Sequence, residues 1–154
     1  MELKTKRCLI RPFQITDIDN FMEYRNNEKW MQYQGFKGLN KEEYEKQLLY
    51  DVSLDKGMQL AIVDIDNHNL LGDVYLKKEA DVIWVGYTIH PNHSRKGYAC
   101  EALEGIIEWA SLNNIRQVKA GALANNKASI ELLKKAGFIF NCVDNDEQIF
   151  IYTI

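Results

Sequence analysis

Several features that mark particular classes of protein are missing from this sequence of 154 residues. Its three cysteines, Cys8, Cys100 and Cys142, are odd in number and widely spaced, which argues against a disulfide framework or a zinc site. No apolar run approaches the ~20 residues of a membrane-spanning helix, and residues 1–13 contain no stretch typical of a signal peptide. We therefore expect a cytoplasmic protein with reduced thiols, no membrane partner and no metal.

An excess of positive charge is also missing. The 19 Lys and Arg residues are outnumbered by 22 Asp and Glu residues, so the formal net charge at pH 7 is −3. Binding to nucleic acid calls for clustered excess cation, and we therefore do not expect a nucleic-acid partner. Hydrophobic residues make up 46% of the chain and charged residues 27%, which is typical of a folded globular protein. A chain of this length suits one domain, which we expect to span residues 1–154.

The hydrophobic patterning predicts an α/β domain. Alternating or continuous apolar runs indicate strands at residues 3–11, 58–66, 70–78, 81–90, 116–123, 138–143 and 148–154. Caps and helical spacing indicate helices at about 17–25, 41–52, 99–112 and 126–136, the second with Tyr44, Gln47, Leu48 and Asp51 in register. Three of the strands follow one another with short polar turns. The expected fold is therefore a mixed, mostly antiparallel, twisted sheet of about seven strands, flanked by about four helices.

Arg95, Lys96 and Gly97 stand just ahead of the apolar stripe that begins at Ala99. A helix N-terminus presents four backbone N–H groups without partners and carries roughly half a positive charge, a combination that binds phosphate. Glycine allows close approach of the backbone and a positive φ, and the two cations add charge suited to a pyrophosphate. Residues 94–99 thus predict an anion site. A solvated turn in which Gly97 only eases entry into the helix is the alternative.

The anion loop matches neither the dinucleotide fingerprint G-x-G-x-x-G nor the P-loop. Read as Ser94-Arg95-Lys96-Gly97-Tyr98-Ala99, it resembles the pyrophosphate loop of the GNAT acyltransferases, [QR]-x-x-G-x-[GA], with Ser at the first position. GYTIHP (86–91) resembles that family's fourth strand, and NNKASIELLKKAGF (125–138) resembles its N-x-x-[AS]-x-x-L-x-x-x-G-F helix. KRCLIRPFQITDID (6–19) and GYACEAL (97–103) resemble the branch that includes the RimJ and RimL N-terminal acetyltransferases.

This resemblance implies acetyl-CoA as the co-substrate and a sheet that splays apart between its fourth and fifth strands, 81–90 and 116–123. The loop backbone would bind the pyrophosphate, and the backbone near Ile89 would pair with the pantetheine arm like an added strand. Asn126 would contact the pantetheine amide or the sulfur end, unless it is only a helix cap. The cofactor-binding residues implied in this way are Ile89, Ser94, Arg95, Lys96, Gly97, Tyr98, Ala99, Asn126 and Ser129.

The resemblance also implies direct attack of a neutral amine on the thioester in a ternary complex. Many relatives use a Tyr on the last long helix as general acid. Leu133 takes that position here, and Ser129 is the candidate substitute. Many relatives carry a Glu two residues before the Gly of the fourth strand. Trp84 stands there instead, and we expect it to shape the acceptor pocket. The candidates for the general base are Asp73, His90 and the carboxylates of the turn 144–147, and release of the proton to water without a base is the alternative.

The aromatic segment 26–38 is expected on the acceptor side. Trp30, Tyr33 and Phe36 with Glu28 would form a wall suited to a cationic amine, unless the aromatic rings only pack the first two helices onto the sheet. The acceptor is either a protein N-terminus or a small-molecule amine. We expect a monomer, or a homodimer that pairs through an exposed C-terminal strand.

Two other functions stay open. A catalytically silent CoA-binding module is motivated by Leu133 and Trp84, which replace two residues that carry the chemistry in many relatives. The second open function is that of a nucleotide-binding domain that uses the same anion loop. The sequence lacks the second glycine and the acidic residue that such a domain uses for the ribose.

Overall fold

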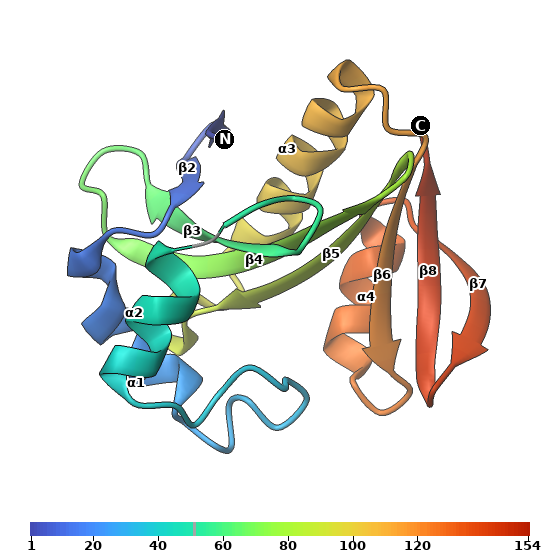
Figure 1. Cartoon of the computed structure of the whole chain (residues 1–154). Helices are drawn as coiled ribbons and strands as arrows, with labels where there is room; N and C mark the ends of the chain where they lie inside the picture. Colours follow the sequence, from blue (N-terminus) through green and yellow to red (C-terminus); the bar gives the residue numbers. More distant parts are fainter. Residues whose placement is uncertain (51) are drawn as a thin grey trace.

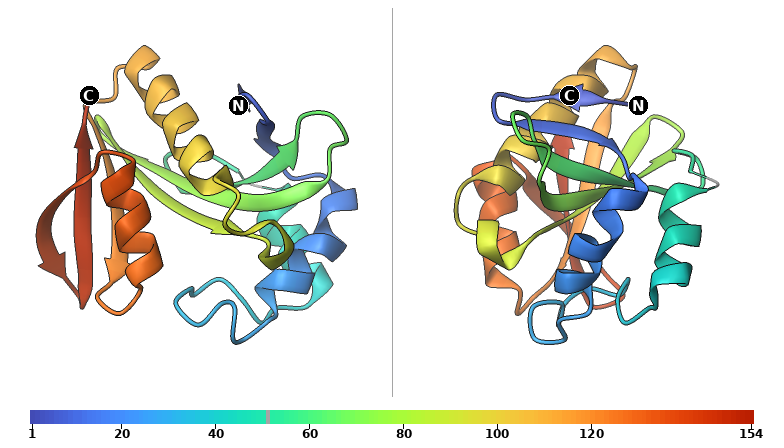
Figure 2. Two further views of the ribbon diagram at one scale, coloured as in Figure 1. Left: turned by 180° about the vertical axis from the view of Figure 1, so that it is seen from behind. Right: turned by 90° about the vertical axis from the view of Figure 1, so that its left-hand side faces the viewer.

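The computed structural model describes residues 1–50 and 52–154; Asp51, expected in the second helix, lies outside the described residues. The chain forms one mixed sheet with helices on both faces (Figures 1 and 2). The strands are β1 (Leu3–Lys4), β2 (Cys8–Pro12), β3 (Met58–Asp64), β4 (Leu70–Glu79), β5 (Val82–Ile89), β6 (Gln117–Leu123), β7 (Ile139–Asp144) and β8 (Glu147–Thr153). The helices are α1 (Ile18–Arg25), α2 (Lys41–Leu49), α3 (Tyr98–Leu112) and α4 (Lys127–Lys135), with single 3₁₀ turns η1 (Ile15–Asp17) and η2 (Pro91–His93).

The strand order is β1-β2-β3-β4-β5-β6-β8-β7, and every pair is antiparallel except β5 with β6. The predicted mixed α/β sheet is therefore confirmed. It has eight strands because the segment expected as one strand over 3–11 folds back on itself, so that Leu3 pairs with Ile10. Helix α2 ends at Leu49, earlier than the expected end near residue 52.

The sheet opens between β5 and β6. These strands pair in parallel only from Val82 to Trp84, opposite Gln117 to Lys119. Beyond Trp84 they diverge, and Figure 1 shows β5 curving away with β4 while β6, β8 and β7 stand together as a separate part of the sheet. The predicted splay is therefore confirmed. In the described part of the chain, the β6-facing edge of β5 has no partner strand after Trp84, so its backbone groups are open to a ligand, apart from the carbonyl of Ile89, which accepts a hydrogen bond from Trp30.

The core consists of two hydrophobic clusters, one on each face of the sheet. Helices α3 and α4 cover one face, where the predicted stripe of α3 is buried (Ala99, Ala102, Leu103, Ile106 and Ala110). On the other face, α1 and α2 pack against each other through edge-to-face contacts of Phe21 with Tyr24 and Tyr44, and they share a hydrophobic cluster with β3. These three rings are fully buried, and each stabilises the fold by roughly 1.5–3 kcal/mol. Phe36 contacts Phe21 and Tyr44, so this aromatic residue of the segment 26–38 does pack the helices.

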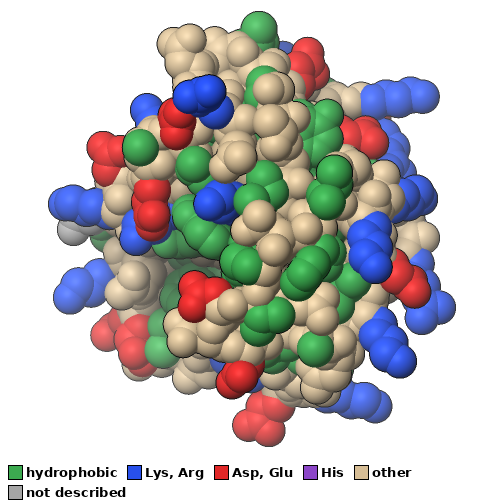
Figure 3. All heavy atoms as spheres, turned by 90° about the vertical axis from the view of Figure 1, so that its right-hand side faces the viewer, with side chains coloured by type: hydrophobic (Ala, Val, Ile, Leu, Met, Phe, Trp, Pro, Cys, Tyr) green, Lys and Arg blue, Asp and Glu red, His purple; other side chains and the backbone are tan. Residues whose placement is uncertain are grey.

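The C-terminal strand is not an edge of the sheet. Strand β8 lies between β6 and β7, so the expectation that it could pair with a second copy was wrong in its choice of strand. Strand β7 is the edge, and all six of its residues are exposed, Ile139 to 74% of its surface. Figure 3 views the molecule from this side, with hydrophobic side chains scattered across the middle of the face.

Candidate active site

Two neighbouring cavities bear on function, and the larger, of about 460 Å³, lies between β5, the start of α3 and α4. It brings together residues that are far apart in the sequence. Of the residues predicted to bind the cofactor, those lining it are Ile89, Ser94, Arg95, Gly97, Tyr98, Ala99, Asn126 and Ser129. Lys96 does not line the cavity. The opening of the sheet therefore leads to the predicted anion loop at one end and to the start of α4 on the opposite side.

The anion loop has a backbone conformation that exposes N–H groups. Arg95 and Gly97 both have positive φ, 60° and 83°, and Gly97 is the N-cap of α3. No backbone N–H of residues 95–100 has a hydrogen-bond partner among the described residues, whereas the N–H of Glu101 bonds to the carbonyl of Gly97 at 3.0 Å. The hydroxyl of Ser94 donates to the carbonyl of Pro91 at 2.9 Å and so holds the loop itself. Successive free N–H groups of this kind form a concave site for an anion.

Arg7, in the turn between β1 and β2, braces the anion loop. Its Nη1 donates to the carbonyl of Lys96 at 2.9 Å, its Nε donates to Glu101 at 2.7 Å, and its guanidinium lies 4.3 Å from the ring centre of Tyr98. Partial burial raises the pKa of Glu101, but hydrogen bonds from Thr5 and Arg7 outweigh burial and lower this pKa to about 2. The brace was not predicted, because no local pattern connects residues 94 positions apart.

Asn126 and Ser129 lie at the start of α4. The side chain of Asn126 accepts a hydrogen bond from the backbone N–H of Ser129 at 3.3 Å, so it does cap the helix, and its amide also lines the cavity. The hydroxyl of Ser129 lies 2.7 Å from that of Tyr87. Burial raises the pKa of Tyr87 to about 12. Tyr87 was missed by sequence reasoning, although the two-residue period of a strand places it on the same face as the predicted Ile89.

Two aromatic residues of the segment 26–38 bridge the mouth of the larger cavity. The indole Nε1 of Trp30 donates to the carbonyl of Ile89 at 2.9 Å, and the hydroxyl of Tyr33 donates to the carbonyl of Asn125 at 3.4 Å. Both were expected in the acceptor pocket, but they line the larger cavity instead. Glu28, expected beside them, is exposed and is not among the residues lining either cavity.

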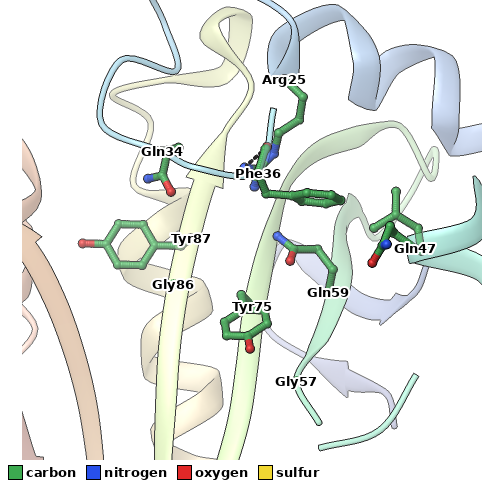
Figure 4. A pocket seen from close by; sticks show the side chains of 10 residues that line it. Arg25, Gln34, Phe36, Gln47, Gly57, Gln59, Tyr75, Gly86 and Tyr87 are labelled. Carbon is green, nitrogen blue, oxygen red and sulfur yellow. Dashed lines mark hydrogen bonds between the residues drawn. The ribbon is translucent and has the colours of Figure 1, made fainter. Parts of the chain in front are cut away.

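The smaller cavity, of about 370 Å³, lies over β3, β4 and β5, beside α1 and α2 (Figure 4). It is lined by Arg25, Gln34, Phe36, Gln47, Leu48, Gly57, Gln59, Tyr75, Gly86 and Tyr87. Gln34 and Tyr87 line both cavities, so the two spaces meet at these side chains. Trp84, expected in this pocket, lies instead beside Lys119, whose Nζ is 5.7 Å from its ring centre.

Asp73, one of the predicted general bases, is fully buried. Its carboxylate accepts hydrogen bonds from Arg25 at 2.5 Å, from Gln59 at 2.6 Å and from the hydroxyl of Tyr24. A buried carboxylate next to a buried guanidinium neutralises it, and removing either partner leaves an uncompensated charge. Asp73 therefore holds Arg25 in place and does not line either cavity, which argues against a role as base.

The other predicted positions also lie outside the two cavities. His90 is buried against the rings of Tyr24 and His93, and its Nδ1 accepts a hydrogen bond from the backbone N–H of Asn92 at 3.1 Å. The turn 144–147 connects β7 to β8, at the far edge of the sheet. Leu133, at the position where many relatives have a tyrosine, is fully buried in the core.

Among residues 1–50 and 52–154, no three His, Cys, Asp or Glu side chains come together in a way that would hold a metal ion. No helix in the described part of the chain combines the length and apolarity needed to cross a membrane.

Residues 7–139 match the family described as the Acetyltransferase (GNAT) domain. The chain belongs to this family. Among curated relatives, the uncharacterized N-acetyltransferase YnaD of Bacillus subtilis is 29% identical over 140 residues, which cover 89% of this chain and 82% of that protein. Both the family and this relative identify the chain as an acetyltransferase, and acetyl-CoA is the co-substrate of the GNAT family.

Solved GNAT structures share the fold over nearly the whole chain. A GNAT-family acetyltransferase from Bacillus anthracis superimposes with a TM-score of 0.87 at 20% identity, covering 99% of this chain and 98% of that one. The spermidine N-acetyltransferase from Vibrio cholerae, solved with CoA and spermine, has a TM-score of 0.78 at 16% identity and covers 96% of this chain and 95% of that one. At these identities the likeness concerns the fold alone.

Proposed function

We propose that residues 1–154 act as one N-acetyltransferase domain, which moves an acetyl group from acetyl-CoA to a primary amine. The observation that supports this most strongly is the larger cavity. It joins the free N–H groups of residues 95–100 to the unpaired edge of β5 and to the polar start of α4. Each of these three surfaces suits a different part of acetyl-CoA.

The anion loop suits the pyrophosphate of acetyl-CoA. Its N–H groups and the N-terminus of α3 attract negative charge, and the exposed cations Arg95 and Lys96 add to this field. The unpaired edge of β5 suits the pantetheine arm, whose amides would hydrogen-bond to it like those of an added strand. The amide of Asn126 suits the end of the arm that carries the thioester, next to Ser129.

The smaller cavity suits the acceptor amine. It meets the larger cavity at Gln34 and Tyr87, so an amine entering it would approach the thioester from the opposite side of β5. Its polar lining includes the amides of Gln34, Gln47 and Gln59, the hydroxyl of Tyr75 and the guanidinium of Arg25, whose charge is already paired with Asp73. The amides and the hydroxyl recognise their ligand through neutral hydrogen bonds. We therefore favour a protein N-terminal amine, as in the RimJ and RimL branch, or a small polar amine.

The chemistry that this arrangement supports is direct attack of the amine on the thioester carbonyl. Holding both reactants in adjoining cavities supplies much of the rate enhancement, since proximity alone contributes ~7–11 kcal/mol. A backbone N–H on the open edge of β5 would stabilise the negative charge that develops on the carbonyl oxygen. With Asp73 paired and His90 buried elsewhere, the proton lost by the amine would pass to water.

A thiol-release assay with acetyl-CoA and a panel of amines tests this function. The panel contains peptides with free N-terminal Ser or Ala, glycinamide, lysine and spermidine, and calorimetry measures acetyl-CoA binding in parallel. We expect binding together with amine-dependent thiol release, fastest with the peptides or glycinamide. Release only with spermidine would contradict the proposed acceptor class.

A catalytically silent CoA-binding module is the second candidate. It is favoured by one observation: none of the predicted bases lines either cavity. Tight binding of acetyl-CoA without release of thiol for any amine would establish this candidate and overturn the transferase function. The cytoplasmic location expected from the sequence stays a prediction.

A further inference from the structure

A pair of hydroxyl groups ties together the two walls of the larger cavity. Tyr87 projects from β5, and Figure 4 shows its ring extending sideways from the strand, away from Gln59 and Phe36. Its Oη lies 2.7 Å from the Oγ of Ser129 on α4. Both residues line the larger cavity, and Tyr87 also lines the smaller one. The pair therefore stands where the two cavities meet.

The chemistry of the two hydroxyls decides the direction of this hydrogen bond. A phenol is a much stronger acid than an aliphatic alcohol, so it is the better donor, and the alcohol oxygen is the better acceptor. The Tyr87 hydroxyl therefore donates to Ser129. Its second contact, with the backbone carbonyl of Ser129, is longer at 3.4 Å and competes weakly. Because Ser129 then accepts from Tyr87, its own hydrogen is left to point into the cavity.

We infer that Tyr87 is the positioning residue that aims the Ser129 hydroxyl at the thioester sulfur, in place of the tyrosine that Leu133 replaces on α4. This inference rests on the proposed function. Leu133 is fully buried in the core and offers no polar group, whereas Tyr87 brings a tyrosine hydroxyl to the same cavity from the opposite wall.

The amine nitrogen bonds to the thioester carbon, the carbon–sulfur bond breaks, and the leaving sulfur carries the negative charge. Ser129 stabilises this thiolate by a hydrogen bond and passes its proton to it, and the proton shed by the amine nitrogen returns to Ser129 through water. Tyr87 keeps its own proton throughout, since burial raises the pKa of its hydroxyl to about 12.

The thiol of bound CoA provides a readout that needs no acceptor. A hydrogen-bond donor next to a thiolate favours the charged form and lowers the pKa of the thiol. The ultraviolet absorbance of the thiolate measures this pKa, with a complex of desulfo-CoA as the blank. We expect the pKa of the bound thiol to be lower in the wild type than in Ser129→Ala and Tyr87→Phe. Tyr152→Phe is the matched control, because this partly buried tyrosine packs against the core away from both cavities.

Steady-state kinetics with acetyl-CoA and the best amine of the panel complete the test. We expect kcat to fall roughly 10- to 100-fold in Ser129→Ala and roughly tenfold in Tyr87→Phe, with the KM for acetyl-CoA nearly unchanged. Because Tyr87 acts through Ser129, the double variant should be no slower than Ser129→Ala. These kinetic results, together with a bound-thiol pKa that is higher in Ser129→Ala and Tyr87→Phe than in the wild type, would support the inference.

Two outcomes would overturn it. An active wild type whose kcat and bound-thiol pKa are unchanged by Tyr87→Phe would refute the role of Tyr87 and leave the transferase function standing. A wild type that binds CoA but transfers acetyl to no amine would refute the transferase function, and the catalytic role of the pair with it.

Discussion

The Nη1 of Arg7 donates a hydrogen bond of 2.9 Å to the backbone carbonyl of Lys96, across 89 positions of the sequence. This contact joins the turn between β1 and β2 to the anion loop. By holding this carbonyl, Arg7 fixes the backbone of the loop whose N–H groups at residues 95–100 have no partner among the described residues. The first strands of the sheet thus support the site without lining it.

Replacing Arg7 should weaken acetyl-CoA binding. In Arg7→Met the aliphatic stem stays and the guanidinium is lost, so the loop is no longer held. We expect the Kd for acetyl-CoA, measured by calorimetry, to rise roughly 3- to 10-fold, the loss of about one hydrogen bond. Lys6→Met is the control, because this substitution removes the same charge at the neighbouring residue, and Lys6 is exposed. Equal effects of the two variants would show that only net charge matters.

Gly97 tests the conformation of the loop itself. Its φ of 83° lies in the left-handed region, which costs a residue with a side chain about 1–2 kcal/mol. Gly97→Val should therefore lower the unfolding free energy only modestly. The valine would also force the loop toward another backbone conformation and misplace its N–H groups, so we expect a large rise in the KM for acetyl-CoA. An unchanged KM would refute the assignment of this loop.

The hydrogen bonds of Glu101 with Arg7 and Thr5 should make the unfolding free energy depend on pH. The pKa of Glu101 falls from 4.5 to about 2 in the folded protein, because hydrogen bonds from Thr5 and Arg7 outweigh burial. A lowered carboxyl pKa stabilises the fold above the unfolded value and loses that contribution as pH falls toward the folded value. The wild type should therefore be more stable than Glu101→Gln above about pH 5, with the difference shrinking between pH 4.5 and about 2.

Denaturant unfolding at a series of pH values measures this difference. Glu108→Gln is the control, since Glu108 is an exposed carboxylate on the same helix. A difference between wild type and Glu101→Gln that stays constant from pH 7 to pH 2 would contradict the account of the brace.

The substitution Asp73→Asn tests whether Asp73 is a structural carboxylate or a catalytic base. In Asp73→Asn the buried Arg25 loses its charge partner, which should lower the unfolding free energy by about 3–5 kcal/mol. The exposed pair of Asp81 with Arg116 gives the matched control, since Asp81→Asn should cost at most about 1 kcal/mol. The pH dependence of kcat, measured at a temperature where the variant stays folded, should keep its midpoint. Loss of the ascending limb of that profile would restore Asp73 as a base.

Local patterns were enough to predict most of the fold. The stripe of α3 follows from apolar residues that recur with the helical period, and all the strands from β3 to β8 were found by composition and turns. The fold-back of the first strand was missed because its turn, around Thr5, contains neither Gly nor Pro. The opening between β5 and β6 carries no signal in its own residues and was expected only from the family resemblance.

The site was predicted in part, for a physical reason. The anion loop and the start of α4 are short contiguous segments, so their residues could be found together. The choice among the base candidates could not be made from the sequence, because residue type does not tell whether a carboxylate such as Asp73 is free or already paired, as it is with Arg25. The pair of Tyr87 and Ser129 depends on the sheet opening, which brings together residues 42 positions apart.

The most direct test of the central claim is mass spectrometry of the amine after incubation with acetyl-CoA and the wild-type protein. We expect at least one amine of the panel to gain the mass of an acetyl group, and Gly97→Val to form this product far more slowly at low acetyl-CoA concentration. The absence of any acetylated amine, with acetyl-CoA bound and left intact, would contradict the transferase function.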